Sequence, residues 1–164
     1  MIINVKNQST AATAAIIRFA ATPEIASAVA DLSAGYPDAQ RVWRGIAIID
    51  RRHVLVQDEI NAEQPVDVAW HMHTKSTVKI DGSRATFTQD DRTLYLRVLS
   101  PANARLYVAE AETQPPQLPL KNVRRLTVTL PEPATPLQLV IVLSTDADAE
   151  ASSPSELTAW PTGK

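Results

Sequence analysis

The 164-residue sequence has no cysteine, only four glycines, 5% aromatic residues and a net charge of -2. Without cysteine the chain has no disulfide, no thiolate metal ligand and no thiol nucleophile. Because glycine-rich phosphate loops need several glycines close together, the scarcity of glycine argues against a nucleotide-binding enzyme. The small negative charge removes the attraction to phosphate on which nucleic-acid binding mostly rests, so we expect no nucleic-acid partner.

Long apolar runs are also absent from the sequence. No stretch approaches the roughly 20 apolar residues of a membrane span, and the first residues have no charged segment that leads into an apolar one. We therefore expect no membrane partner and no export signal in the sequence as written. A chain of this length can bury about 70% of its unfolded surface, which is enough for one domain with its own core.

Most of the sequence alternates between apolar and polar residues, which indicates strands. Every second residue is apolar in 66–72, and the same period recurs in 94–98, 126–130 and 137–143. This pattern is typical of antiparallel strands with one face in a core. Turn residues such as Asp81-Gly82 separate the strands and indicate hairpins. We predict an all-β fold, an antiparallel, supersandwich-like β-sandwich of about ten to eleven strands with little helix.

The first 35 residues are less regular than the middle of the sequence. Ala11–Ala15 and Ala26–Ala30 have helical propensity. The β-branched pair Ile16-Ile17 and the break at Thr22-Pro23 favour short strands instead.

The composition changes near the end of the sequence. From Thr145 to Lys164 it turns to Ala, Ser, Asp, Glu and Pro, with a single tryptophan. Such a segment buries little apolar surface and is typical of a disordered tail. We predict a β-sandwich domain over residues 1–144 and an acidic, disordered tail over 145–164.

Two histidines on one predicted strand are the sharpest local feature. His71 and His73 project from the same strand face, and Asp67 lies on that face four residues before His71. Two imidazoles and a carboxylate would suit an open zinc or iron site. A polar, solvent-exposed strand face, opposite a core face that includes Trp70, gives the same pattern without metal. We expect no cofactor unless Asp67, His71 and His73 bind zinc.

The densest basic cluster surrounds a tryptophan. Arg41, Arg44, Arg51 and Arg52 lie close to Trp43 in the sequence. Such a set could bind an acidic sugar by ion pairing and stacking, and we take Arg41, Trp43 and Arg44 as candidate substrate-binding residues. The same charges would also protect an edge strand from aggregation. No serine has the relation to His and Asp that would indicate a triad, so no catalytic residue is assigned.

A series of short segments covers about two-thirds of the sequence in a fixed order: 30–37 (ADLSAGYP), 42–45 (VWRG), 50–59 (DRRHVLVQDE), 68–74 (VAWHMHT), 79–82 (KIDG) and 96–101 (LRVLSP). In order and spacing, these segments resemble the C-terminal β region of the heparinase II/III-like polysaccharide lyases. In the complete enzymes the resemblance implies β-elimination next to a uronic acid, performed mainly by tyrosine and histidine between an α/α toroid and the β domain.

The resemblance implies a role without catalysis for this chain. No catalytic residue of the family maps onto a position here, and His73 matches a recurrent position whose expected role is to order the sheet. We expect the C-terminal β-sandwich domain of a longer lyase, beginning just after the catalytic histidine and supporting an acidic-polysaccharide cleft. Its expected partners are acidic polysaccharide and the upstream α/α toroid domain. The location would be periplasmic or secreted if the parent lyase is exported.

Two alternatives to the lyase interpretation stay open. The chain could be an autonomous carbohydrate-binding module for acidic glycans, which would use Arg41, Trp43 and Arg44. It could also be a small metal-dependent enzyme built on Asp67, His71 and His73.

Overall fold

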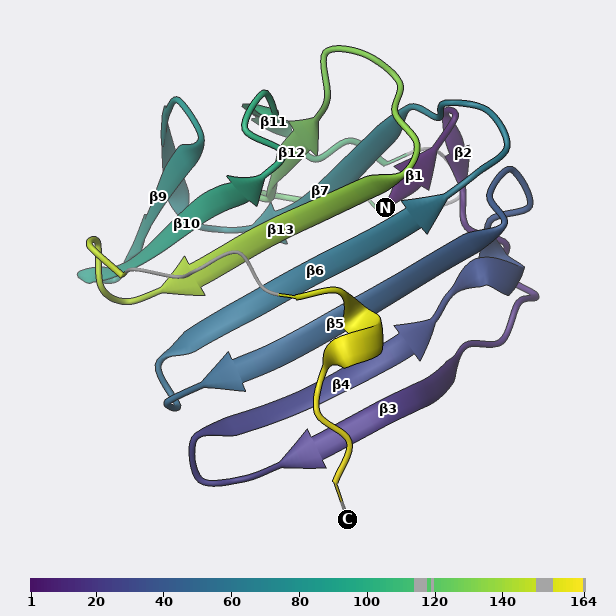
Figure 1. Ribbon diagram of the computed structural model, residues 1–164. Helices are drawn as coiled ribbons and strands as arrows, with labels where there is room; N and C mark the ends of the chain where they lie inside the picture. Colours follow the sequence, from purple (N-terminus) through teal and green to yellow (C-terminus); the bar gives the residue numbers. More distant parts are fainter. Residues whose placement is uncertain (114–117, 119, 150–154, 164) are drawn as a thin grey trace.

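The computed structural model describes residues 1–113, 118, 120–149 and 155–163. These residues form two antiparallel β-sheets that pack as a sandwich (Figure 1). The prediction of an all-β antiparallel sandwich is confirmed, with thirteen strands among the described residues in place of about ten to eleven. Helix is limited to two short 3₁₀ segments, η1 (Ser33–Gly35) and η2 (Leu157–Ala159). Within the described part of the chain, no helix is long and apolar enough to cross a membrane.

The larger sheet contains eight strands. They are β3 (Ala15–Ala21), β4 (Ile25–Asp31), β5 (Arg41–Ile49), β6 (His53–Asn61), β8 (Thr77–Asp81), β9 (Arg84–Gln89), β10 (Arg92–Ser100) and β13 (Leu137–Ser144). Their order across the sheet is β3-β4-β5-β6-β13-β10-β9-β8. β3 and β4 form a hairpin, so short strands and not helices occupy the N-terminal region. The predicted hairpin at Asp81-Gly82 joins β8 to β9.

The smaller sheet contains five strands. They are β1 (Ile2–Ile3), β2 (Lys6–Asn7), β7 (Val68–Thr74), β11 (Arg105–Glu110) and β12 (Arg124–Thr129), in the order β11-β12-β7-β1-β2. Three of these strands, β1, β2 and β11, were not predicted. β1 and β2 have two residues each, which is too short to show a period.

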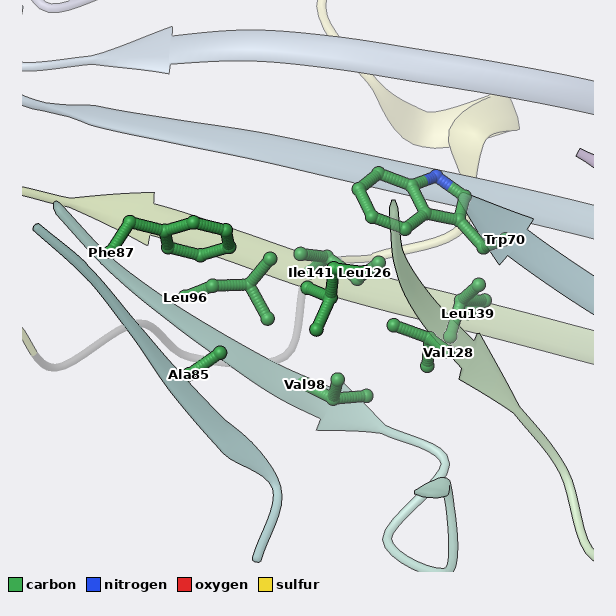
Figure 2. Close-up of a cluster of buried hydrophobic side chains, with 9 residues drawn as sticks. All are labelled: Trp70, Ala85, Phe87, Leu96, Val98, Leu126, Val128, Leu139 and Ile141. Carbon is green, nitrogen blue, oxygen red and sulfur yellow. The ribbon is translucent and has the colours of Figure 1, made fainter. Parts of the chain in front are cut away.

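The main core lies between the two sheets. Figure 2 shows nine buried side chains that come from both sheets. Trp70 is 6% exposed and faces this core, as the alternation in its strand predicts. The nine residues are Trp70, Ala85, Phe87, Leu96, Val98, Leu126, Val128, Leu139 and Ile141.

The smaller sheet covers only part of the larger one. A row of cross-strand neighbours on the inner face runs from Ile141 through Val56, Ile46 and Ala28 to Phe19. Directly opposed residues of an antiparallel pair point to the same face, so this row belongs to one surface. Ile141 is fully buried, whereas Ile46 is 47% exposed and Phe19 is 55% exposed. Figure 1 shows the smaller sheet behind β13 and β10, with β3 and β4 extending beyond it.

The C-terminal segment crosses the opposite face of the larger sheet. Figure 1 shows η2, in yellow, lying over β5 and β4. Leu157 and Trp160 are 0% and 6% exposed and pack with Val29 and Ala47. The prediction of a disordered tail is therefore wrong for residues 155–163, because two apolar side chains anchor them. Residues 150–154 and 164 lie outside the described part of the chain.

Gly45 allows this segment to lie close to the sheet. A Cβ atom at Gly45 would collide with the Leu157 side chain and lie 2.8 Å from the Trp160 ring. We name residues 155–163 the C-terminal strap. Its backbone is held as well, since Gln57 Nε2 donates to the Ser155 carbonyl at 3.1 Å and Leu157 N–H donates to Glu59 Oε1 at 2.6 Å.

Candidate functional site

Arg44, one of the candidate sugar-binding residues, is held inside the sandwich. Its guanidinium donates to both carboxylate oxygens of Asp58, at 2.6 and 2.8 Å. The Asp58 side chain is 1% exposed and that of Arg44 is 25% exposed. Burial lowers the pKa of Arg44, but the hydrogen bond and the charge of Asp58 outweigh this effect and raise it. Arg44 is thus already paired and is not available to an acidic sugar.

Arg41 and Trp43 lie on the opposite face of β5 from Arg44, because successive strand residues point to opposite sides. The guanidinium carbon of Arg41 lies 4.8 Å from the centre of the Trp43 ring. Arg41 also lies near a carboxylate, with its Nη2 atom 3.7 Å from Glu59 Oε2. The predicted site of Arg41, Trp43 and Arg44 is therefore split between the two faces of the larger sheet.

The predicted metal ligands are not brought together. Among the described residues, no group of three His, Cys, Asp or Glu side chains could hold a metal ion. The Nδ1 atom of His71 lies 3.0 Å from the Thr127 hydroxyl, while His73 and Asp67 are exposed. The three-ligand interpretation of Asp67, His71 and His73 is therefore not supported, and their strand alternation reflects a polar outer sheet face.

His71 is kept uncharged by its surroundings. Its pKa is lowered to about 4, first by burial and then by the positive charges of Arg125, the chain amino terminus and His73. An imidazole with such a pKa is neutral at pH 7 and donates or accepts hydrogen bonds without adding charge. His71 therefore cannot supply the cationic attraction that an acidic glycan requires, and its Nε2 atom is buried without a hydrogen-bond partner among the described residues.

Two arginines that belong to no ion pair among the described residues, Arg105 and Arg125, lie near His71 on the outer face of the smaller sheet. β11, β12 and β7 align in register there, with Tyr107 opposite Thr127 and Thr127 opposite His71. The neighbouring rows contain Arg125 and Arg105. We name this surface the basic face; its residues are Arg105, Tyr107, Arg125, Thr127, His71 and His73.

The basic face combines charge with an aromatic ring. Within the described part of the chain, neither Arg105 nor Arg125 belongs to an ion pair. Tyr107 is 46% exposed. A guanidinium binds carboxylate or sulfate oxygens with two parallel hydrogen bonds, and an exposed ring offers a surface on which a sugar can stack. This arrangement fits an acidic sugar chain lying across β11, β12 and β7.

The sequence contained a signal for the basic face that local charge density does not reveal. In β12 the apolar residues Leu126 and Val128 alternate with Arg125 and Thr127, so the polar pair must lie on the side away from the core, where Thr127 is nevertheless fully buried. β11 repeats this alternation, but the pairing of the two strands depends on contacts between distant segments. Charge clustering along the sequence therefore favoured Arg41 and Arg44, whereas the sheet register assembles Arg105 and Arg125.

Comparisons with known proteins find similarity at the level of structure. No protein-family model matches the sequence, and no curated protein matches it. The heparan sulfate lyase HepC from Pedobacter heparinus is 16% identical over 80% of this chain, with a TM-score of 0.61. A heparinase III, the BT4657 gene product, is 12% identical over 87% of the chain, with a TM-score of 0.68. Another heparinase III structure is 11% identical over 87% of the chain, with a TM-score of 0.61.

These structures show that the chain has the fold of a heparinase III domain. The chain spans 21% of the length of the heparan sulfate lyase and 22–23% of the two heparinase III structures. The similarity is therefore to one domain of much longer proteins.

Proposed function

We propose that this chain serves as the β-sandwich domain of a heparinase-like polysaccharide lyase and supports an acidic-polysaccharide cleft without being catalytic alone. The observation that carries this proposal is the structural match to heparinase III domains over 80–87% of the chain. The resemblance of the sequence segments to the same lyases supports it independently.

The basic face supplies the contacts that such a role needs. Arg105 and Arg125 would bind carboxylate or sulfate groups, and Tyr107 would stack on a sugar ring. Thr127 is fully buried and lies 3.0 Å from His71 Nδ1 through its hydroxyl, so these two residues support the face from below. We assign this face binding and positioning.

The exposed inner face of the larger sheet supports a partner in the same parent protein. β1 pairs with β7 only at Val68 and Ala69, so within the described residues no strand lies beside His71–Thr74 on that side. Ile46 lies exposed in the middle of a row that is buried in the core at Ile141 and exposed at Phe19. We propose that the remainder of a longer lyase, which includes the expected α/α toroid domain, adds β-structure along this edge and covers Ile46. The row then becomes an ordinary inter-sheet contact along its whole length.

Affinity for heparin tests the acidic-glycan proposal. The purified chain should be retained on immobilised heparin at moderate salt, and Arg125→Ala should elute at clearly lower salt because one guanidinium contact is lost. Arg84→Ala is the matched control, since it removes an exposed arginine from β9 on the larger sheet. Equal elution of the two variants would show that only net charge is measured and would contradict a specific basic face.

Assays for unsaturated products test the second part of the proposal. The chain alone should give no increase in ultraviolet absorbance from heparin, heparan sulfate or hyaluronan. Elimination activity of the purified chain would refute the non-catalytic role.

The coding sequence upstream tests the proposed partner. A reading frame that continues into a helical domain is expected, and in that longer protein the amides of His71–Thr74 should exchange with solvent more slowly than in the isolated chain. Equal exchange in both proteins would show that no strand pairs along β7.

A further inference from the structure

A second polar cluster lies on the outer face of the larger sheet, away from the basic face. A pocket of about 230 Å³ lies there, at the ends of β5, β6 and β13. Its polar lining consists of Arg41, Glu59, Asn61, Gln138 and Glu156. The C-terminal strap contributes Glu156 to the wall of this pocket.

Glu59 is the central group of this pocket. The residue is 5% exposed, and its Oε1 atom accepts hydrogen bonds from Leu157 N–H at 2.6 Å and from Gln57 Nε2 at 2.9 Å. Its Oε2 atom lies 3.7 Å from Arg41 Nη2 but has no hydrogen-bond partner among the described residues, and neither does the buried Nε–H of Arg41. A buried carboxylate oxygen without a donor is costly, so this arrangement is one that a ligand would stabilise.

The two unpartnered atoms have opposite hydrogen-bonding needs. Glu59 Oε2 requires a donor, and Arg41 Nε–H requires an acceptor. A hydroxyl group supplies both, whereas a carboxylate or sulfate only accepts and an ammonium group only donates. Arg41, Glu59 and Glu156 together carry a net charge of -1, which disfavours an acidic ligand.

We infer that this pocket binds an uncharged sugar unit through its hydroxyl groups, with Glu59 as acceptor and Arg41 as donor. Asn61 and Gln138 offer side-chain amides to further hydroxyls. The inference is independent of the basic face, because it concerns the other sheet and a ligand without charge. In a mixed glycan chain, such a site would engage a neutral residue and not a uronic acid.

A matched pair of sugars tests the ligand class. D-glucose and D-glucuronic acid differ only at C6, where the second carries a carboxylate. Titration of the full chain, followed by the NMR signals of Arg41 Nε–H and of the Asn61 and Gln138 amides, should saturate with glucose at a Kd on the order of 1–10 mM. Glucuronic acid should bind at least several-fold more weakly. Equal or tighter binding of glucuronic acid, or the absence of saturation with either sugar, would overturn the inference.

Variants test the assigned residues. Glu59→Gln keeps an oxygen for Leu157 N–H but replaces the accepting Oε2 by a donor, so glucose affinity should fall at least tenfold. Glu110→Gln removes an exposed carboxylate from the smaller sheet and should leave the affinity unchanged. Should Glu59→Gln disturb the strap, Asn61→Ala provides a second test at the pocket wall, with an expected loss of several-fold. Unchanged affinity in folded Glu59→Gln would refute the role of Glu59, and Arg125→Ala should have no effect on glucose.

Discussion

The buried and exposed halves of the larger sheet differ in what covers them and hardly at all in sequence. Ile141 and Ile46 belong to the same row of cross-strand neighbours, with only Val56 between them. Ile141 is fully buried under the smaller sheet, whereas Ile46 is 47% exposed. Alternation therefore specifies which face of a strand is apolar, but a second layer decides whether that face is removed from water. The inner face of β3–β5 therefore has the apolar residues typical of a core, but the smaller sheet does not pack against it.

The largest expected effect tests this contrast directly. Ile141→Ala should lower the free energy of unfolding by about 2–5 kcal/mol, because it leaves a cavity in a packed core. Ile46→Ala should lower it by less than about 1 kcal/mol, since half of that side chain already contacts solvent. Equilibrium denaturation in urea measures both. Similar losses for the two variants would show that the β5 half is already covered in solution, for example by self-association.

Substitutions at the boundary between the two halves should cause the next largest loss of unfolding free energy. Arg44 and Asp58 pair there, and Arg44→Leu would leave the fully buried carboxylate of Asp58 without its cation. We expect a loss of about 2–3 kcal/mol in unfolding free energy, which is below the range for a fully buried pair because Arg44 is partly exposed.

Arg44→Leu with Asp58→Leu is the control for this prediction. Two apolar side chains of similar size leave no unpaired charge, so the double variant should recover part of the lost stability. A double variant less stable than Arg44→Leu alone would indicate that the ion pair itself, and not the unpaired carboxylate, determines the effect.

The two faces of β5 offer a third contrast. Ile46 faces the uncovered side, while its neighbour Gly45 lies under the C-terminal strap. Gly45→Ala should displace the strap, because the new Cβ would collide with Leu157. We expect a loss of about 1–2 kcal/mol, faster proteolysis after Ser144 and a red shift of Trp160 fluorescence.

A matched control separates strap displacement from a general effect on β5. Ala47→Gly lies on the same strap-covered face and removes a methyl group without adding bulk. It should lower stability slightly and leave Trp160 fluorescence unchanged. Retained strap protection in Gly45→Ala would mean that the sheet shifts to accept the methyl group.

The same contrast explains which parts of the structure could be predicted from the sequence. Period-two alternation predicted the strands with a buried face, including the inward direction of Trp70, because this information is local. It missed β1 and β2, because β1 is defined by pairing with β7 and β2 by pairing with β1. It also misassigned the tail, where two apolar side chains, Leu157 and Trp160, pack on the sheet among mostly polar residues. The candidate site was harder still, since Arg105 and Arg125 become neighbours only through the register of β11 and β12.

The effect that is smallest at pH 7 concerns His71, at the edge where the covering sheet stops. Its pKa is lowered from 6.5 to about 4 in the folded chain, chiefly by burial. The unfolded chain therefore takes up this proton first as the pH falls, and protonation favours unfolding. The contribution of neutral His71 to stability is complete above pH 6.5 and is lost progressively between pH 6.5 and about 4.

His71→Asn should flatten the pH dependence of stability in that window and change it little at pH 7 and above. Urea midpoints between pH 7 and pH 4 measure the slope, and His73→Asn, an exposed histidine two residues along the same strand, is the control. A slope that stays at the wild-type value in His71→Asn would show that other groups dominate acid sensitivity. In a longer protein that pairs along His71–Thr74, burial of the imidazole would increase. The pH range over which the contribution of His71 to stability is lost would then extend to lower pH. His71 would thus report whether a further strand pairs along β7.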